Sequence, residues 1–280
     1  MLRTILITLL GPMLWGSTYA VFTETLPVDH PLLVGAMRAL PAGLILLMLN
    51  PRIPPLEALK RHAVLGFCNI GLFFALLFIA AARMPGGLAA TLGAIQPLVV
   101  ILASGWLIGR APHPVQILAG IAGVLGVGLL VLSPDAHPDP IGVAAAIGGT
   151  LSMAAGTVLI DRWGRRGTPL ETTTWQLILG GAMLLPVALL VEGLPPSPGL
   201  RETLGYSWLM LLGTAFAYFV WIRGIGRLGP SAVYLALASP VVATAIGAIG
   251  LGEWFSPWQW AGMALVIGAT AVGVSVGRRG

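Results

Sequence analysis

The sequence predicts an all-α, polytopic membrane protein, and three observations support this: its composition, the length of its apolar runs and the placement of its basic residues. Of its 280 residues, 57% are apolar and only 9% are Asp, Glu, Lys or Arg, and the mean hydropathy is +0.92. A soluble domain carries ~25% charged residues, so this chain cannot cover a water-exposed surface. Backbone N–H and C=O groups without hydrogen bonds are costly in hydrocarbon, so only helices or closed barrels cross a membrane. The apolar runs are long and do not alternate strictly between apolar and polar residues, which favours helices over barrel strands.

Ten apolar runs, each bounded by charges, prolines or glycines, are long enough to cross a bilayer. About 20 residues span ~30 Å of hydrocarbon, so ten crossings use ~200 residues and leave no room for a separate soluble domain. The first run also has the basic start and small residues of a signal peptide, but its removal would break the repeat described below, so we expect it to remain the first helix. The runs lie at 4–22, 31–49, 62–82, 86–109, 114–132, 140–160, 172–191, 204–224, 229–252 and 257–277.

The basic residues are distributed unevenly between the two ends of these runs. With the N-terminus inside, 12 of the 15 Lys and Arg residues fall on the inner side, Arg83 and Arg201 lie outside, and Arg38 lies within the second helix. This positive-inside bias places both termini in the cytoplasm. The twelve are Arg3, Arg52, Lys60, Arg61, Arg110, Arg162, Arg165, Arg166, Arg223, Arg227, Arg278 and Arg279.

The chain contains an internal repeat with a shift of 143 positions, which aligns 83–132 with 226–275 without a gap. The proline and glutamine pairs carry the comparison: Pro97 with Pro240, Pro114 with Pro257, and Gln116 with Gln259. A five-helix repeat must insert its second copy upside down, as in transporters whose halves open a central site to each side in turn. We therefore expect two inverted five-helix halves, 1–137 and 138–280.

Several function classes lack the residues that they need. Cys68 is the only cysteine, which excludes an internal disulfide and a cysteine metal cage. The net charge of +5 comes from basic residues scattered among loops, so no nucleic-acid partner is expected. Residues 224–229 match a dinucleotide-binding pattern but bridge two apolar helices, so we expect no cofactor. The histidines are too widely spread for a metal site, and no nucleophile with a base points to an enzyme.

Arg38 lies about seven residues into the second predicted helix, and therefore ~10 Å deep in the membrane. A charge at that depth is expensive, so the side chain should face the bundle interior or a wet cavity. As a functional residue, it would hold a substrate carboxylate through two hydrogen bonds. As a structural residue, it would snorkel outward or bond helix-end carbonyls. The sequence leaves both roles open.

Pro97 and Pro240 lie in mid-helix at matching repeat positions, each after a polar residue, Gln96 or Ser239. A proline in a helix interior frees the carbonyl four residues earlier and kinks the helix. Interrupted helices at equivalent places in two halves point to a transport site. We expect these four residues near that site; the alternative is that proline is simply common in membrane helices.

Aromatic residues recur in pairs at helical spacing, so that each pair falls on one helix face. Where such faces line a cavity, they bind aromatic rings or cations. The alternative for each residue is that it packs against other helices or belongs to the aromatic belt at the membrane interface. No Asp or Glu lies near the middle of any run, so no carboxylate is available there to pair with a substrate amino group. That group would have to bind to the aromatic faces, Gln96, Gln176 or the freed carbonyls. The pairs are Trp15 with Tyr19, Phe74 with Phe78, and Tyr218 with Trp221.

Three stretches carry a family resemblance: Leu14-Trp15-Gly16-Ser17, Met37-Arg38-Ala39-Leu40, and Leu251-Gly252-Glu253 followed by Pro257, Gln259 and Gly262. They resemble the ten-helix EamA-type transporters of the drug/metabolite transporter superfamily, which include bacterial aromatic amino-acid exporters. One position departs from the family pattern. Arg110 aligns with Glu253 of the second half, whereas the first-half copies in the family often have a residue that resembles this Glu. The resemblance covers essentially the whole chain and implies a bacterial inner-membrane exporter of small metabolites, including amino acids.

Together these features predict a secondary transporter that exports neutral and aromatic amino acids around a central cavity, with a small-molecule substrate and the bilayer as its partners. The alternatives are efflux of organic cations or drugs, which needs the aromatic faces but not Arg38, and a non-transporting assembly subunit. The missing midplane carboxylate predicts facilitated exchange, or another coupling route, rather than a carboxylate relay. The predicted substrate-binding residues are Trp15, Tyr19, Arg38, Phe74, Phe78, Gln96, Pro97, Gln176, Tyr218, Trp221, Ser239 and Pro240.

Overall fold

The computed structural model describes residues 1–84, 86–93, 96, 99–100, 103, 109, 113–131, 139–164, 167–195, 197–228, 235–251 and 257–276. Every regular element in these ranges is a helix, which confirms the all-α prediction for this part of the chain. The helices are α1 (Leu2–Gly16), α2 (Thr18–Thr25), α3 (Pro31–Leu49), α4 (Leu56–Gly66), the π-helix η1 (Phe67–Leu72), α5 (Phe73–Arg83), α6 (Gly86–Gly93), α8 (Pro114–Val131), α9 (Pro140–Trp163), α10 (Pro169–Val191), α11 (Leu200–Ser207), the π-helix η2 (Trp208–Phe216), α12 (Ala217–Leu228), α13 (Ala238–Leu251) and α14 (Pro257–Val276).

Within the described residues, six helical stretches are long and apolar enough to cross a membrane. They confirm a polytopic membrane protein, whereas the number of ten crossings remains a prediction. Shorter apolar helices occupy the predicted runs near 114–132, 229–252 and 257–277. The six stretches are Leu2–Thr25, Pro31–Leu49, Leu56–Arg83, Pro140–Ile160, Pro169–Val191 and Leu200–Leu228.

Three of these stretches begin at least three residues earlier than the apolar runs predict. The starts at Leu56, Pro169 and Leu200 precede the predicted positions 62, 172 and 204. Each of the three first turns carries one acidic residue, Glu57, Glu171 or Glu202. Negative charge stabilises a helix N-terminus, so these polar turns stay helical although they are not apolar.

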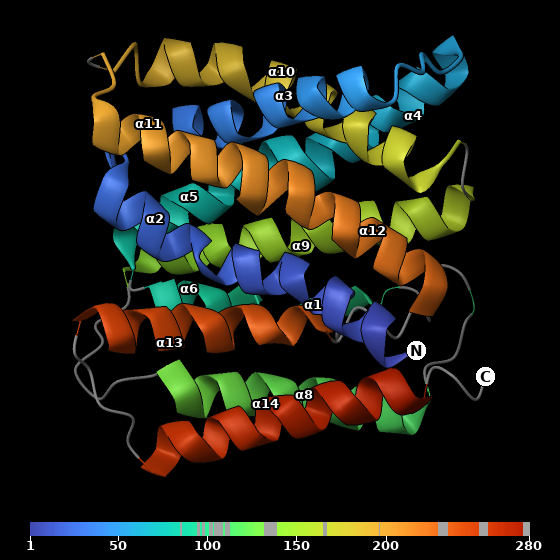
Figure 1. The fold of residues 1–280 in the computed structure, drawn as a ribbon, viewed down its shortest axis with the longest axis vertical. Helices are drawn as coiled ribbons and strands as arrows, with labels where there is room; N and C mark the ends of the chain where they lie inside the picture. Colours follow the sequence, from blue (N-terminus) through green and yellow to red (C-terminus); the bar gives the residue numbers. More distant parts are fainter. Residues whose placement is uncertain are drawn as a thin grey trace.

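The helices run side by side along one common direction (Figure 1). Helices α3, α4 and α10 form one edge of the bundle, α8 and α14 form the other, and the remaining helices lie between them (Figure 1). The start of α1 and the end of α14 lie at the same end of the bundle (Figure 1). This arrangement agrees with an even number of crossings.

Three helix pairs pack closely in antiparallel order. On α3, Gly35 meets Leu184 and Gly43 meets Ile178 of α10, so the residue order along the two helices is reversed. A Cβ at Gly43 would lie 2.8 Å from the backbone N of Ile178, so only glycine permits this approach. The same reversed order holds between α5 and α9 and between α1 and α12. In all three pairs, a helix from the first part of the chain packs on one from the second.

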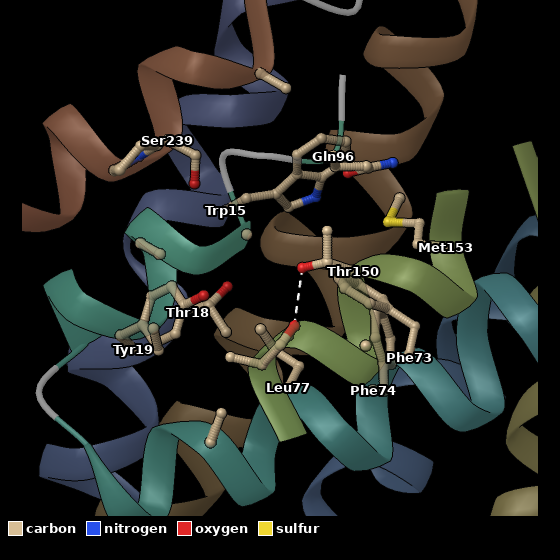
Figure 2. Close-up of a pocket in the computed structure, with 18 of the residues that line it drawn as sticks. Trp15, Thr18, Tyr19, Phe73, Phe74, Leu77, Gln96, Thr150, Met153 and Ser239 are labelled. Carbon is tan, nitrogen blue, oxygen red and sulfur yellow. Dashed lines mark hydrogen bonds between the residues drawn. The ribbon is translucent and has the colours of Figure 1, made fainter. Parts of the chain in front are cut away.

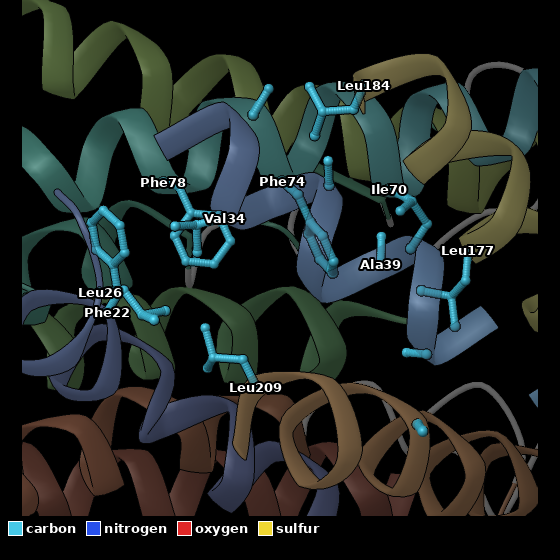
Figure 3. Packing of buried hydrophobic residues seen from close by; sticks show 14 of the residues in the cluster. Phe22, Leu26, Val34, Ala39, Ile70, Phe74, Phe78, Leu177, Leu184 and Leu209 are labelled. Atoms are coloured by element: carbon cyan, nitrogen blue, oxygen red, sulfur yellow. The ribbon is translucent and has the colours of Figure 1, made fainter. Parts of the chain in front are cut away.

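The largest cluster of buried side chains lies where α2, α3, α5, α10 and η2 meet (Figure 3). Phe22, Phe78 and Leu209 in this cluster are fully buried, and the ring centroids of Phe22 and Phe78 lie 5.0 Å apart. Lipid tails are as apolar as these side chains, so close packing rather than removal from water stabilises the cluster. Met48 and Leu190 are instead more than four-fifths exposed (81% and 86%), as suits a surface that faces lipid.

Two of the long stretches contain a π-helix: η1 lies between α4 and α5, and η2 lies between α11 and α12. A π-helix interrupts the regular hydrogen bonding of an α-helix, and such segments are frequent at functional sites. Moving η1, residues 67–72, by the repeat shift of 143 positions gives 210–215, which falls inside η2. The two π-helices therefore occupy matching positions in the two predicted halves.

Candidate functional site

A cavity of about 140 Å³ lies inside the bundle, among α1, α2, α3, α5, α6, α9, α12 and α13. Aromatic side chains from the first and third of the long stretches face it, among them Trp15, Tyr19, Phe73 and Phe74 (Figure 2). The fold thus gathers residues from distant parts of the sequence around one space. The predicted site residues that line it are Trp15, Tyr19, Arg38, Phe74, Gln96, Tyr218, Ser239 and Pro240.

Three predicted site residues lie elsewhere in this conformation. Phe78 is fully buried against Phe22, because the helix face that it shares with Phe74 extends beyond the cavity into the core. Trp221 packs its ring on Trp15, with 5.3 Å between centroids, on the side away from the cavity lining. Gln176 is buried between helices and accepts a hydrogen bond from Asn69 Nδ2 over 2.7 Å.

Pro97 lies outside the described residues, so its predicted position has no structural counterpart. Its repeat partner Pro240 is described and lies at the cavity beside Ser239. The prediction of a mid-helix position is wrong for Pro240, because α13 begins at Ala238 and the proline stands in its first turn.

Arg38 on α3 is the buried cation of the cavity, with only 2% of its surface exposed. Its Nε donates to Thr214 Oγ1 over 2.7 Å, and its Nη2 donates to the backbone O of Gly213 over 2.9 Å. Its guanidinium lies over the ring of Phe74, 4.7 Å from the centroid. The third nitrogen, Nη1, is buried and finds no hydrogen-bond partner among the described residues. The side chain therefore has two anchored nitrogens and one nitrogen, Nη1, without a partner among the described residues.

The two π-helices supply backbone acceptors to side chains of other helices. Gly213 O in η2 accepts from Arg38, and Cys68 O in η1 accepts from Ser152 Oγ of α9 over 2.7 Å. Regular α-helical bonding is interrupted in both segments, so their carbonyls are available for such contacts. Each of the two hydrogen bonds joins a helix of one predicted half to the π-helix of the other.

Two further polar atoms at the cavity are hydrogen-bond donors in need of an acceptor. Trp15 Nε1 and Thr18 Oγ1 are buried, line the cavity and have no partner within the described part of the chain. A buried donor without a partner costs about 1–3 kcal/mol. A bound group rich in acceptor oxygens would remove this cost for both, as well as for Arg38 Nη1.

Carboxylates are absent from the lining of the cavity among the residues that the structure describes. The sequence itself has no Asp or Glu between Glu57 and Asp135, or between Glu202 and Glu253. Acidic residues lie near helix ends instead: Glu192 accepts from the backbone N of Leu32 and of its neighbour, at 2.7 and 2.8 Å, and so caps α3. The charge at the cavity is therefore positive.

Comparison with known proteins assigns the chain to a family. The EamA-like transporter family matches residues 2–132 and 140–274. The chain belongs to this family. Membership confirms the predicted resemblance to EamA-type transporters and the prediction of a transporter rather than an enzyme. The resemblance to aromatic amino-acid exporters remains a prediction.

Relatives of this EamA-like transporter cover nearly its whole length. Protein PecM of Dickeya dadantii (strain 3937) is 42% identical over 265 residues, which cover 94% of this chain and 89% of that protein. The uncharacterized inner membrane transporter YedA of Escherichia coli (strain K12) is 26% identical over 276 residues, covering 95% of this chain and 88% of YedA. A crystal structure with 21% identity superposes with a TM-score of 0.77 and covers 99% of both chains, so it shares the fold.

Several residues at the cavity of this EamA-like transporter escape prediction from the sequence. Thr18 lies three residues after Trp15 on the same helical face, so spacing alone would have found it. Thr150 and Met153 on α9 also line the cavity, but they stand in a run of small residues in which Ser152 and Thr157 are equally polar, and no charge or repeat match marks them. Phe73 lines it beside Phe74, which only the tertiary structure reveals.

Proposed function

We propose that this EamA-like transporter exports small metabolites that carry a carboxylate, with neutral and aromatic amino acids as the first candidates. The observation that carries the proposal is the position of Arg38 Nη1, a buried donor at an aromatic cavity for which the described residues offer no partner. An unpaired buried charge is expensive, so an anion that enters this cavity removes a cost that the empty protein bears. A guanidinium also binds carboxylate with favourable planar geometry.

The aromatic side chains supply the second part of the proposed recognition. Trp15 and Tyr218 lie at an angle of 60° with 5.3 Å between ring centroids, and both line the cavity. Tilted and offset arrangements of this kind are favourable between rings, so a substrate ring has partners on several sides. The volume of about 140 Å³ is close to the ~150 Å³ void that takes up benzene in another protein, which suits one ring.

We further propose that residues 1–137 and 138–280 are inverted halves that move against each other. The antiparallel packing of α3 on α10 supports this, because they are the second predicted crossings of the two halves and inverted copies place equivalent helices in reversed order. The antiparallel pairs α5–α9 and α1–α12 give further support, because each joins the third predicted crossing of one half to the first predicted crossing of the other. The matching positions of η1 and η2 support it as well. Relative motion of two such halves would open the cavity to each side in turn.

We place the protein in the bacterial cell membrane with both termini in the cytoplasm. The excess of basic residues on the predicted inner side supports this orientation. The common end shared by the start of α1 and the end of α14 supports it too (Figure 1). The inner-membrane name of the relative YedA supports the choice of membrane.

Transport by purified protein in proteoliposomes tests the proposal. Counterflow of a panel of labelled amino acids is measured for the wild type, for Arg38→Gln and for the control Arg83→Gln, whose exposed side chain pairs with Asp139 over 3.6 Å. Loss of a charged hydrogen bond costs ~1.5–3 kcal/mol, so we expect Arg38→Gln to lower aromatic amino-acid flux at least about tenfold. Unchanged flux in a folded Arg38→Gln protein would remove the carboxylate-binding role.

Efflux of organic cations is the second candidate, because the ring faces of Trp15 and Tyr218 at the cavity suit a cation. Arg38 opposes it through like-charge repulsion. The same proteoliposomes, loaded with a cationic dye, separate the two. Dye export that rises in Arg38→Gln while amino-acid flux is absent in every variant would favour the cation exporter.

A further inference from the structure

Among the described residues that line the cavity, Arg38 is the one charged side chain. The sequence has no Asp or Glu within 58–134 or within 203–252. The potential inside the cavity is therefore positive, and the low dielectric of a membrane-embedded bundle leaves it weakly screened.

The acceptors closest to Arg38 are already engaged. Thr214 Oγ1 and Gly213 O both accept from Arg38 itself. On the opposite helix α9, the Thr150 hydroxyl donates to Ala146 O over 2.8 Å, so its hydrogen is committed along the helix (Figure 2). An ammonium group has three donors and no acceptor. Of the buried polar atoms at the cavity without a partner among the described residues, Arg38 Nη1 and Trp15 Nε1 are donors, and only Thr18 Oγ1 can also accept.

An amino acid is a zwitterion, and its two charged groups experience this cavity in opposite ways. The carboxylate meets the guanidinium and the indole N–H of Trp15, whereas the ammonium meets a like charge and has no carboxylate to pair with among the described residues that line the cavity. Burial of a charged group without a counter-ion is costly, so the ammonium reduces the benefit that the carboxylate brings.

We infer that the cavity recognises one aromatic ring and one carboxylate and does not recognise an amino group. Aromatic 2-hydroxy and 2-oxo acids are therefore carried in preference to the amino acid with the same ring, and the corresponding amine is not carried. This inference rests on the proposed function and names the part of the substrate that the site recognises. The hydroxyl or oxo oxygen in place of the ammonium is an acceptor, which suits the surplus of donors at the cavity.

A series of compounds with one phenyl ring tests the inference in proteoliposomes at neutral pH, where the acids are ionised. Labelled L-phenylalanine and labelled 3-phenyllactate are each measured in counterflow, and phenylpyruvate and 2-phenylethylamine serve as competitors. Protein-free liposomes correct for leak. We expect half-saturation for 3-phenyllactate at a concentration at least about tenfold below that for phenylalanine, and no competition by the amine.

Variants show whether Arg38 is the cause of this preference. Arg38→Gln is expected to weaken 3-phenyllactate transport at least about tenfold and to bring the two labelled compounds close together. The control Arg83→Gln, outside the cavity, retains the wild-type preference. Phenylalanine that is transported as well as or better than 3-phenyllactate would overturn the inference and leave the proposed function intact. Transport of neither labelled compound by folded protein would overturn both.

Discussion

Arg38 Nε and Thr214 Oγ1 are 2.7 Å apart, and their hydrogen bond joins α3 to the π-helix η2. With the bond from Nη2 to Gly213 O, it fixes the plane of the guanidinium before any substrate arrives. The remaining nitrogen, Nη1, is thus held in one orientation in the side chain of a residue that lines the cavity. An anion that meets an oriented donor loses less free energy to the ordering of the site than one that meets a mobile side chain.

Replacement of Thr214 by valine tests this positioning role. Thr214→Val keeps the shape of the side chain and removes the acceptor of Arg38 Nε, so a buried charged donor loses a partner at a cost of ~1–3 kcal/mol. We expect a lower unfolding temperature in detergent and a several-fold higher KM for aromatic carboxylates. Thr214→Ser retains the hydroxyl and should stay close to the wild type in both measurements. A valine variant whose KM is unchanged would show that Arg38 does not need this anchor.

Trp15→Phe separates the ring of Trp15 from its N–H group. The indole N–H is buried with no partner in the part of the chain that the structure describes, so its loss should not destabilise the empty protein. If a substrate oxygen accepts from it, the KM for aromatic carboxylates rises about threefold to tenfold. Transport kinetics and thermal unfolding of the same preparation check both expectations. A large fall in unfolding temperature with unchanged KM would instead assign Trp15 to packing.

Two different roles are expected for Gln176. The sequence predicts a substrate-binding role, whereas its hydrogen bond with Asn69 in η1 predicts a structural one. Gln176→Leu leaves the buried Asn69 amide without this partner, and we expect a loss of ~1–3 kcal/mol in stability with KM within about twofold of the wild type. In the double variant with Asn69→Leu, part of the stability should return, because both polar partners are then gone. A selective rise in KM without loss of stability would favour the binding role.

The α3–α10 contact depends on glycine. A Cβ at Gly181 would lie 2.7 Å from the backbone N of Leu40, so Gly181→Ala forces the two helices apart. We expect a cost of ~1–3 kcal/mol from overpacking. Gly226 on α12 provides the matched control, because a Cβ there would meet nothing within 4 Å. Gly226→Ala should leave the unfolding temperature unchanged or raise it, since alanine favours helix. Equal effects of the two substitutions would contradict the close approach of α3 and α10.

The sequence predicts the helical membrane fold well because that prediction depends on composition and run length. The ends of the helices are less predictable, since the acidic first turns at Glu57, Glu171 and Glu202 are stabilised by the helix dipole rather than by apolarity. The π-helices have no signature in the sequence, because they arise where packing between helices favours an extra residue in a turn.

The candidate site is predictable where a residue is chemically unusual for its surroundings. Arg38 stands out because a charge in a membrane helix must find a partner or a cavity, and the structure provides both kinds of contact. Phe74 and Phe78 look equivalent by spacing, yet Phe74 lines the cavity and Phe78 lies in the core. That difference depends on where α2 crosses α5, which is a property of the tertiary structure alone.

Binding of a labelled aromatic carboxylate to purified protein tests the central claim most directly, because it measures Arg38 without the transport cycle. We predict that Arg38→Gln raises the Kd for 3-phenyllactate at least about tenfold, while Arg83→Gln leaves it unchanged. An Arg38→Gln protein that is folded and binds 3-phenyllactate as tightly as the wild type would contradict the account.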